Sequence, residues 1–336
     1  MVPVVACFGE MLLRLSPPPG TPLARAGSLA MHFGGAEANV AAALTSLGTP
    51  ARMLTALPDN ALGAAAKAAL GAAGVDTRFV RFAPGRLGLY FLEPPAGPCS
   101  GRVTYDRAGS VFSLAPAGLF DFGAALQGAA LLHVSGITPA LGPGGVALAG
   151  AAIAAAKAAG VPISFDGNYR GNLWQAWNGD PRAILSELIA EASILFGNHR
   201  DLSLLLGREL SGDGPERRRH AAEAAFAAFP RLQLLASTSR HVVDAGTHRL
   251  AARVDSRDGS AQTEEMVVSG IVDRIGSGDA FAAGVLHRHL AGAPLRAVAE
   301  AGLALAALKH GISGDVILAS EAELAEFRPD GGDVRR

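Results

Sequence analysis

The sequence has only two cysteines, Cys7 and Cys99, among its 336 residues. A disulfide framework of the kind that stabilises small secreted proteins needs several cysteine pairs. No basic segment followed by an apolar run precedes the first strand-like stretch, so nothing in the sequence indicates secretion. We therefore expect a cytoplasmic protein.

The sequence also lacks an excess of either charge. It has 29 lysines and arginines against 30 aspartates and glutamates, a formal net charge of -1. Proteins that bind nucleic acid or anionic membranes usually present a strongly basic surface, so we expect neither partner. The alanine-rich segment 145–160 is interrupted by Lys157, and its apolar content is mostly methyl groups. A packed helix is therefore a better interpretation than a membrane span.

Lysine is the scarcest charged residue. Only Lys67, Lys157 and Lys309 are present and none follows a glycine, which excludes the G-x-x-x-x-G-K-[ST] phosphate-binding loop. The nine histidines show no H-x-x-x-H spacing joined to a cysteine or carboxylate cluster. The sequence therefore predicts no zinc site.

Short apolar runs typical of buried strands alternate with segments of helical periodicity. The first run, 4–9, is rich in β-branched residues and ends on a glycine, as a buried parallel strand would. Further strand-like runs lie at 51–57, 131–134, 162–165, 194–196 and 232–236, and helical segments at 37–48, 61–74, 144–160, 181–191 and 216–229. This alternation predicts an α/β fold, with a mainly parallel sheet covered on both faces and a ligand crevice at the carboxyl ends of its strands.

Two stretches, 29–34 and 87–106, interrupt the alternation. Within the second, 87–93 and 102–106 predict a strand pair around a loop rich in proline and glycine. We expect these stretches to form a small β appendage on the α/β body. The charge-rich segment 201–219 is interpreted as a solvated surface excursion.

A turn of small residues, Gly276-Ser277-Gly278, and then Asp279 directly precede the helical segment 280–286. Unpaired N–H groups at a helix start can bind an anion, and small residues let the backbone approach a phosphoryl group closely. The helix dipole keeps a first-turn carboxylate ionised, so Asp279 could accept a hydroxyl proton. The alternative is an ordinary N-cap aspartate after a glycine turn.

A second glycine pair, Gly34-Gly35, also precedes a helical segment. It could bring the backbone close to a substrate hydroxyl. The alternative is a tight turn between a strand and a helix.

With both glycine signatures in this order and separation, the sequence resembles the ribokinase-like (PfkB) sugar kinases. The resemblance covers roughly residues 4–327 and is closest to the 2-keto-3-deoxygluconate kinases. The segments that match this branch are 34–40 (GGAEANV), 88–90 (GLY), 105–110 (YDRAGS), 135–139 (SGITP), 165–170 (FDGNYR) with Leu173 and Trp174, and 273–281 (DRIGSGDAF).

The resemblance implies a three-layer α/β kinase domain over residues 1–330, with a discontinuous β lid from about 12–35 and 86–112. Residues 331–336 are expected to be frayed. It also implies ATP, Mg²⁺ and an aspartate base, and leaves a monovalent cation open. The base falls on Asp279, and the anion hole falls on Gly276, Ser277 and Gly278, where the serine replaces the commoner alanine. The positions implied for substrate are Gly34, Gly35, Asn39, Tyr90, Tyr105, Arg107, Arg170 and, as a further substrate-side candidate, Asp315.

The two arginines among these positions make chemical sense independently of the family. A 2-keto-3-deoxy acid has a carboxylate that ribose and fructose lack, and a planar guanidinium can bind it through two parallel hydrogen bonds. Alternatively, Arg107 and Arg170 are structural and pair with nearby acids, and Tyr90 and Tyr105 only pack in the lid.

Around the nucleotide the sequence departs from the family pattern. Residues 237–242 read Ser-Thr-Ser-Arg-His-Val where many members have Lys-x-Gly-x-x-Gly, and Asn198-x-x-Asp201 stands where Asn-x-x-Glu is usual. The nucleotide contacts expected here are Asn198, Thr238, Arg240, Gly276 and Gly278.

We therefore expect an ATP-dependent sugar-acid kinase that converts 2-keto-3-deoxygluconate to its 6-phosphate. A kinase of a neutral sugar or nucleoside, and a catalytically silent sugar-binding protein of the same fold, are the alternatives. Because an exposed β appendage presents a strand edge, a second copy of the chain is its simplest cover, and we expect a homodimer or a multiple of it.

Overall fold

The computed structural model describes residues 2–95 and 101–328. The strands are β1 (Val4–Phe8), β2 (Leu12–Ser16), β3 (Ala30–Gly34), β4 (Ala51–Pro58), β5 (Val80–Ala83), β6 (Gly88–Glu93), β7 (Arg102–Asp106), β8 (Ala129–Ser135), β9 (Ile163–Asp166), β10 (Ile194–Phe196), β11 (Leu234–Asp244), β12 (Thr247–Ser256), β13 (Ser260–Gln262) and β14 (Met266–Ser269). The helices are α1 (Ala36–Ser46), α2 (Ala61–Ala72), α3 (Val111–Leu114), α4 (Phe122–Leu126), α5 (Ile137–Ala140), α6 (Pro143–Ala158), α7 (Gly171–Gln175), α8 (Pro181–Ile189), α9 (His199–Leu206), α10 (Gly214–Ala228), α11 (Ser277–Leu290), α12 (Leu295–His310) and α13 (Glu321–Glu326), with 3-10 turns at Leu23–Arg25 and Ala117–Leu119.

The larger sheet has ten strands in the order β13-β12-β11-β10-β9-β8-β1-β4-β5, with β14 also paired to β12. Every pair from β11 to β5 along this order is parallel, whereas β12 pairs antiparallel with β11, β13 and β14. The chain leaves β1 in one direction for β4 and later returns on the other side of β1 for β8. A strand order that reverses in this way opens a crevice at the carboxyl ends of the strands.

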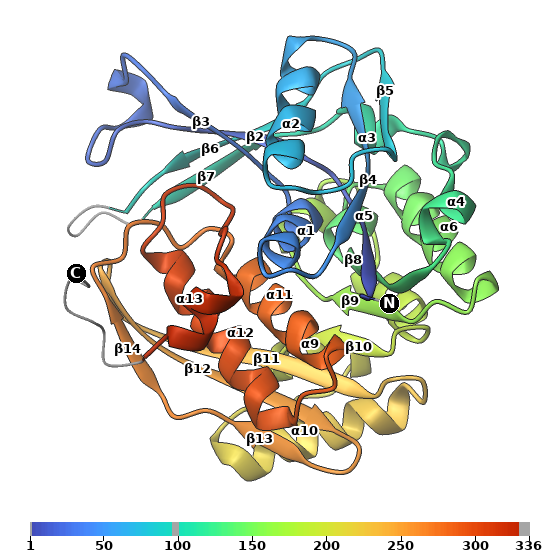
Figure 1. Cartoon of the computed structure of the whole chain (residues 1–336), viewed down its shortest axis with the longest axis vertical. Helices are drawn as coiled ribbons and strands as arrows, with labels where there is room; N and C mark the ends of the chain where they lie inside the picture. Colours follow the sequence, from blue (N-terminus) through green and yellow to red (C-terminus); the bar gives the residue numbers. More distant parts are fainter. Residues whose placement is uncertain (1, 96–100, 329–336) are drawn as a thin grey trace.

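Helices cover both faces of this sheet (Figure 1), and each face has its own apolar core. Strand β1 shows why: Val5 and Cys7 belong to one core, and the alternate residues Ala6 and Phe8 belong to the other. Helices α1, α11 and α12 pack over the first core, and α4, α6, α8 and α10 over the second. Alanines in these helices let them lie close to the sheet.

The smaller sheet has four strands in the order β3-β2-β6-β7 and extends from one side of the molecule (Figure 1). Its central pair, β2 and β6, is parallel, and the outer pairs are antiparallel. The side chains of β6 alternate between buried and half-buried, so one face of this sheet is covered and the other is open. Strand β7 is exposed along its whole length.

The predicted α/β fold with a separate small sheet is confirmed. The sequence interpretation missed that the run at 232–236 continues to Asp244 in β11, which forms a long antiparallel hairpin with β12. It also did not predict the short helix α5. Part of the expected surface excursion at 201–219 is helical, in α9 and α10. The expected fraying at 331–336, and Cys99, lie outside the described residues.

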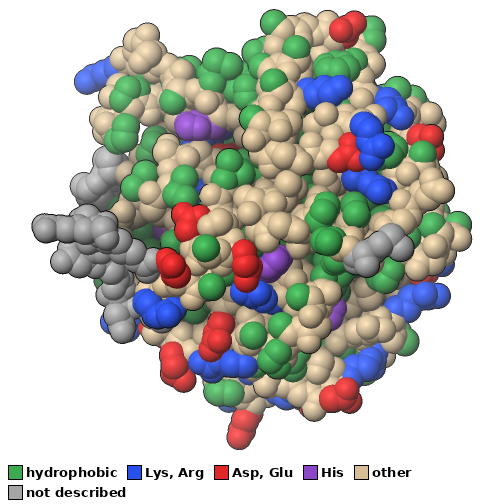
Figure 2. Space-filling model, in the orientation of Figure 1, with side chains coloured by type: hydrophobic (Ala, Val, Ile, Leu, Met, Phe, Trp, Pro, Cys, Tyr) green, Lys and Arg blue, Asp and Glu red, His purple; other side chains and the backbone are tan. Residues whose placement is uncertain are grey.

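Among the described residues, no helix combines the length and hydropathy that crossing a bilayer requires. On the face shown in Figure 2, acidic and basic side chains are interspersed.

Candidate active site

One large cavity, of about 770 Å³, lies between the carboxyl ends of the parallel strands and the small sheet. This volume is in the usual range for a small-molecule site. The residues that line it and were expected from the sequence are Gly35, Asn39, Tyr90, Tyr105, Arg107, Arg170, Asn198, Thr238, Arg240, Gly276, Ser277, Gly278, Asp279 and Asp315. Gly34 is not among the lining residues, although it directly precedes Gly35.

Helix α11 begins at this cavity. Its N-cap, Gly276, has a φ of 83°, which is unfavourable for any residue with a β-carbon, and a β-carbon there would lie 1.8 Å from the backbone oxygen of Asp315. The turn is thus packed against the loop that carries Asp315. Ser277, Gly278 and Asp279 form the first turn, whose N–H groups have no partner within the helix; the N–H of Ser277 donates to the backbone oxygen of Arg274 at 3.3 Å.

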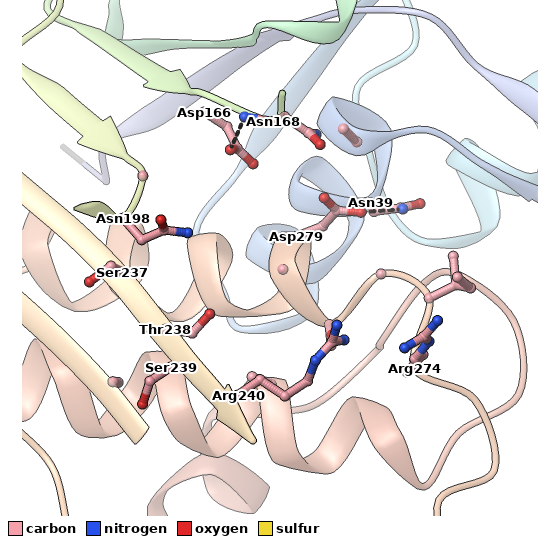
Figure 3. A pocket seen from close by; sticks show the side chains of 18 of the residues that line it. Asn39, Asp166, Asn168, Asn198, Ser237, Thr238, Ser239, Arg240, Arg274 and Asp279 are labelled. Atoms are coloured by element: carbon pink, nitrogen blue, oxygen red, sulfur yellow. Dashed lines mark hydrogen bonds between the residues drawn. The ribbon is translucent and has the colours of Figure 1, made fainter. Parts of the chain in front are cut away.

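Asp279 is held by a hydrogen bond from helix α1. The Asn39 side-chain amide donates to Oδ2 of Asp279 at 2.6 Å, as Figure 3 shows. Burial raises the pKa of Asp279 to about 6, while the Asn39 bond opposes the rise. At neutral pH the carboxylate is therefore ionised and only weakly stabilised, as a general base requires.

Helix α1 begins at the same cavity, directly after Gly35. A β-carbon on Gly35 would lie 2.2 Å from the carbonyl oxygen of Glu10, so this glycine lets two backbone segments approach. In the first turn of α1, Glu37 is buried, and burial raises the pKa of its carboxyl to about 7.

On the small sheet, the rings of Tyr90 and Tyr105 lie 5.9 Å apart between their centroids. Tyr90 is buried and donates its hydroxyl hydrogen bond to Asp315, whereas Tyr105 is 43% exposed. Arg107 is buried and forms an ion pair with Glu10, whose other carboxylate oxygen accepts from the Ser110 hydroxyl. Pairing with an acid was the structural alternative left open for Arg107, and here the acid, Glu10, is itself buried and not at the surface.

Asp315 is also engaged by a buried arginine. Arg14, on β2, lies 2.9 Å from Asp315 through Nη1 and donates to Asp273 at 2.6 Å through Nη2. Asp315 therefore links strands β2 and β6 of the small sheet to the turn at Gly276 that begins helix α11. Its carboxylate is largely occupied by Arg14 and Tyr90, so it faces substrate less freely than the sequence suggested.

Arg170 differs from Arg107 because it is exposed. Its Nη1 donates to the backbone oxygen of Tyr169 at 3.1 Å, and among the described residues no acidic side chain lies within ion-pairing distance of it. The guanidinium of Arg170 is therefore available to an anionic ligand in the cavity.

The other half of the cavity follows β10 and β11. Asn198 caps helix α9: its Oδ1 accepts from the backbone N–H of Arg200 at 2.8 Å, and Oδ2 of Asp201 accepts from the backbone N–H of Asn198 at 2.8 Å. Thr238 and Arg240 are exposed side chains on β11.

Arg274, which the sequence did not single out, lies on the same side of the cavity as Arg240 (Figure 3). Although the Arg240 side chain is exposed overall, its partial desolvation at the cavity wall, and then the nearby charge of Arg274, lower its pKa. Two like charges this close favour an anionic ligand between them.

Several carboxylates also face the cavity. Burial raises the pKa of Asp166 to about 8, and the charges of Asp279, Asp201 and Glu37 add to the rise. Within residues 2–95 and 101–328, no three histidine, cysteine or acidic side chains are grouped as a ready metal site. Mg²⁺ is commonly held by one or two carboxylates together with substrate phosphates, so Asp166 and its acidic neighbours fit such an ion.

Three residues of the site were missed by the sequence interpretation: Glu10, Asp166 and Arg274. Glu10 follows β1 and Asp166 ends β9, and both lie where parallel strands of one sheet meet the crevice. A charged residue at the end of an apolar strand run was the signal that could have found them.

Residues 3–319 match the pfkB family of carbohydrate kinases. The chain belongs to this family. It is 33% identical to a 2-dehydro-3-deoxygalactonokinase from Haloferax volcanii over 96% of each chain, and 28% identical to a 2-dehydro-3-deoxygluconokinase from Thermoproteus tenax over 94% of this chain and 90% of the relative. The crystal structure of a 2-dehydro-3-deoxygluconokinase from Thermotoga maritima superposes with a TM-score of 0.91, at 34% identity over 96% of this chain and 98% of the other.

Family membership confirms the prediction of a carbohydrate kinase. The resemblance inferred from the glycine signatures is confirmed as well. Its closer match to the 2-keto-3-deoxygluconate kinases is also confirmed, since several similar proteins are named as kinases of 2-dehydro-3-deoxy sugar acids.

Proposed function

We propose that this kinase transfers the γ-phosphoryl group of ATP to the 6-hydroxyl of a 2-keto-3-deoxy sugar acid, with 2-keto-3-deoxygluconate as the substrate. The observation that carries this assignment is Arg170, an exposed guanidinium in the cavity with no acidic partner among the described residues. Burial raises the pKa of Asp166, Asp201 and Asp279, and the charge of Arg170 opposes this rise. None of these carboxylates forms an ion pair with Arg170, so a neutral sugar would leave it without a partner at hydrogen-bonding distance. The names of the similar proteins point to the same class of substrate.

Asp279 acts as the general base. Its carboxylate accepts the proton of the 6-hydroxyl as the hydroxyl oxygen attacks the γ-phosphorus in line and the bond from phosphorus to the leaving oxygen of ADP breaks. The Asn39 bond to Oδ2 fixes the orientation of the carboxylate and leaves Oδ1 for the substrate.

The first turn of helix α11 stabilises the negative charge on the transferring group. The N–H of Gly278 has no acceptor within the helix, the N–H of Ser277 makes only a 3.3 Å bond to the Arg274 backbone oxygen, and the positive end of the helix dipole lies at the same place. Gly276 lets this turn approach the phosphoryl group closely, because no side chain lies in between.

Mg²⁺ would be held by Asp166, with Asp201 nearby, together with the phosphates of ATP. When bound, the ion neutralises phosphate charge and relieves the repulsion among the carboxylates of this region.

Arg240 and Arg274 bind the phosphates of ATP, and Asn198 and Thr238 line the same half of the cavity. These arginines take the place of the Lys-x-Gly-x-x-Gly segment that the sequence lacks.

At the other end of the substrate, Arg170 binds the carboxylate, while Gly35, Tyr90 and Tyr105 form the wall around the sugar chain. Arg107 contributes to this wall through its ion pair with Glu10. The small sheet then acts as the lid of the sugar half.

One observation favours a second candidate. Because Glu10 already neutralises Arg107, Arg170 is the only unpaired arginine among the described residues that line the sugar side of the cavity. A kinase of a neutral sugar becomes the alternative if Arg170 serves only to hold the loop before α7, through its bond to the Tyr169 backbone oxygen.

We also propose that the protein is a cytoplasmic homodimer. Strand β7 is an exposed edge of the small sheet, and Met31 on β3 is 52% exposed; a second copy of the chain would cover them. Sedimentation at micromolar concentration tests this: a fully active monomer would contradict it.

The activity is tested by coupled release of ADP with a panel of sugar acids, ketoses, pentoses and nucleosides, with and without Mg²⁺. We expect turnover of 2-keto-3-deoxygluconate, or its C4 epimer, only with the ion present. Equal or faster turnover of neutral sugars would overturn the assignment.

A further inference from the structure

Lys309 is fully buried near the C-terminal end of helix α12, and its partners are unusual for a lysine. Its Nζ donates to the backbone oxygen of Ile312 at 2.8 Å and of Asp273 at 3.2 Å. No ion pair with an acidic side chain is formed by it in the described part of the chain, whereas the exposed Lys157 pairs with Glu191 at 2.7 Å.

The two carbonyl groups belong to two different loops. Asp273 begins the loop 273–276 that leads into helix α11, and Ile312 lies in the loop 311–315 that follows α12. The second loop packs against Gly276, since a β-carbon there would meet the Asp315 oxygen. One ammonium group therefore joins the two loops that support the start of α11.

The carboxylate of Asp273 reinforces the same junction. It accepts the backbone N–H of Ile275 at 3.0 Å and of Gly314 at 3.1 Å, and receives Arg14 at 2.6 Å. With these bonds in place, the backbone oxygens of Asp273 and Ile312 both accept hydrogen bonds from the Lys309 Nζ. Buried carbonyl oxygens need donors, and the ammonium group supplies them together with a complementary positive charge.

The electrostatic surroundings are consistent with a charged Lys309. Burial lowers its pKa, and the charge of Arg14 adds to this, but the carboxylates of Asp273, Asp315 and Asp279 oppose the fall.

We propose that Lys309 is a positioning residue that acts as a built-in monovalent cation: it holds the loops 273–276 and 311–315 together, and so keeps the N–H groups of the α11 start aimed at the phosphoryl group. A covalently attached ammonium does here what a dissolved alkali ion bound by carbonyl oxygens would otherwise do. Turnover then needs no added monovalent cation. The inference rests on the proposed role of the α11 start.

Three variants test this. Lys309→Ala removes the ammonium and leaves a cavity, Lys309→Met keeps the volume without the charge, and Lys157→Ala is the control for a surface lysine. Each is assayed for kcat and both KM values in Na⁺, K⁺, NH4⁺, methylammonium or tetramethylammonium chloride at equal ionic strength.

We expect the wild type and Lys157→Ala to turn over alike in all five salts. Loss of one donor to a developing oxyanion lowers kcat about 100- to 1,000-fold, so loosening the turn in Lys309→Ala should lower kcat about 10- to 100-fold, with less change in KM for the sugar acid. Ammonium or methylammonium should restore kcat in Lys309→Ala, tetramethylammonium should not, and Lys309→Met should stay impaired in every salt.

Unchanged kcat in a folded Lys309→Ala, equal losses in all salts, or a wild type that requires K⁺ would overturn the proposal. Hydrogen exchange gives an answer that needs no turnover: amides in 273–277 and 311–315 should exchange faster in Lys309→Ala and slow again with ammonium. If these amides respond but no sugar acid is phosphorylated by the wild type, the proposed function fails while Lys309 keeps its positioning role. If the wild type phosphorylates the acid and the amides do not respond, the role of Lys309 fails alone.

Discussion

The two halves of the cavity hold their charged side chains differently. On the sugar side, Arg107 is buried against Glu10, and Arg14 is buried between Asp273 and Asp315. On the nucleotide side, Arg240 and Arg274 are exposed, and the described residues offer neither an acidic partner. At Arg107 and Arg14 the sugar half is thus internally paired before any ligand arrives. In the nucleotide half the buried Arg253 is likewise paired, with Asp255 at 2.7 Å, but Arg240 and Arg274 carry positive charge that no described carboxylate pairs with.

This difference matches the ligands that we propose. A sugar acid is small and has to be oriented with its 6-hydroxyl at Asp279, which needs walls whose own side chains do not move. A triphosphate brings several negative charges, and unpaired arginines serve it well. Arg170 is the exception on the sugar side. It is exposed, like the arginines of the nucleotide side, and in our assignment it binds the carboxylate of the substrate.

The largest effect is expected where the two halves meet, at Asp279. In Asp279→Asn the amide oxygen can still accept the hydrogen bond from Asn39, but the amide cannot take the proton of the substrate hydroxyl. General-base catalysis contributes about 100- to 10,000-fold, so kcat should fall at least about 100-fold with little change in thermal stability or sugar binding. Steady-state kinetics with circular dichroism as the folding control checks this.

The pH profile identifies the group. The base must be ionised, and because burial raises the pKa of Asp279 to about 6, kcat/KM should fall as the pH drops through about 6. Near-normal turnover in a folded Asp279→Asn protein would leave Asp279 only its interaction with the positive end of helix α11, since Gly276 and not Asp279 is the N-cap.

The next largest effect tests whether Arg107, on the sugar side, is held in an internal ion pair or is free to bind a ligand. Arg107→Ala leaves Glu10 buried without its partner, and breaking a buried pair destabilises proteins by about 3–5 kcal/mol. We expect a clear fall in the melting temperature of Arg107→Ala, largely relieved in the double variant Glu10→Gln/Arg107→Ala. If Arg107→Ala keeps the wild-type melting temperature, the sugar side is not internally paired and the comparison between the halves fails.

A smaller effect is expected on the nucleotide side. Arg240→Ala and Arg274→Ala should each raise KM for ATP about 10-fold, the value of one charge-assisted hydrogen bond, and leave KM for the sugar acid and the melting temperature unchanged. Arg208→Ala, which changes an exposed arginine that is not among the residues lining the cavity, is the matched control. Equal changes in both KM values would show that these arginines support the whole cavity and not the nucleotide alone.

Much of this site could be predicted from local sequence because it depends on short segments. The start of α11 was visible as three small residues and an aspartate before a helical stretch, and strand β10 was predicted with its observed bounds, Ile194–Phe196. Such features need only the local pattern of small, polar and apolar residues.

What the sequence did not reveal depends on contacts across long stretches of chain. Glu10 and Arg107 are 97 residues apart, and Arg14 and Asp273 are 259 apart. Nothing in the pattern around either arginine distinguishes a buried pair from a ligand-binding side chain. The hairpin of β11 and β12 was not predicted for another reason. The outer half of β11 is exposed, so its sequence does not alternate between apolar and polar residues as a half-buried strand would.

The most direct test of the central claim is the specificity ratio of Arg170→Ala. The ratio is kcat/KM for 2-keto-3-deoxygluconate divided by kcat/KM for the neutral analogue in which CH2OH replaces the carboxylate. A charged hydrogen bond contributes about 1.5–3 kcal/mol, so the ratio should fall about 10- to 100-fold in Arg170→Ala, through the acid alone, and stay at the wild-type value in Arg240→Ala. Equal losses for the acid and the neutral analogue in Arg170→Ala would contradict a carboxylate-binding Arg170, and with it the assignment of a sugar acid as substrate.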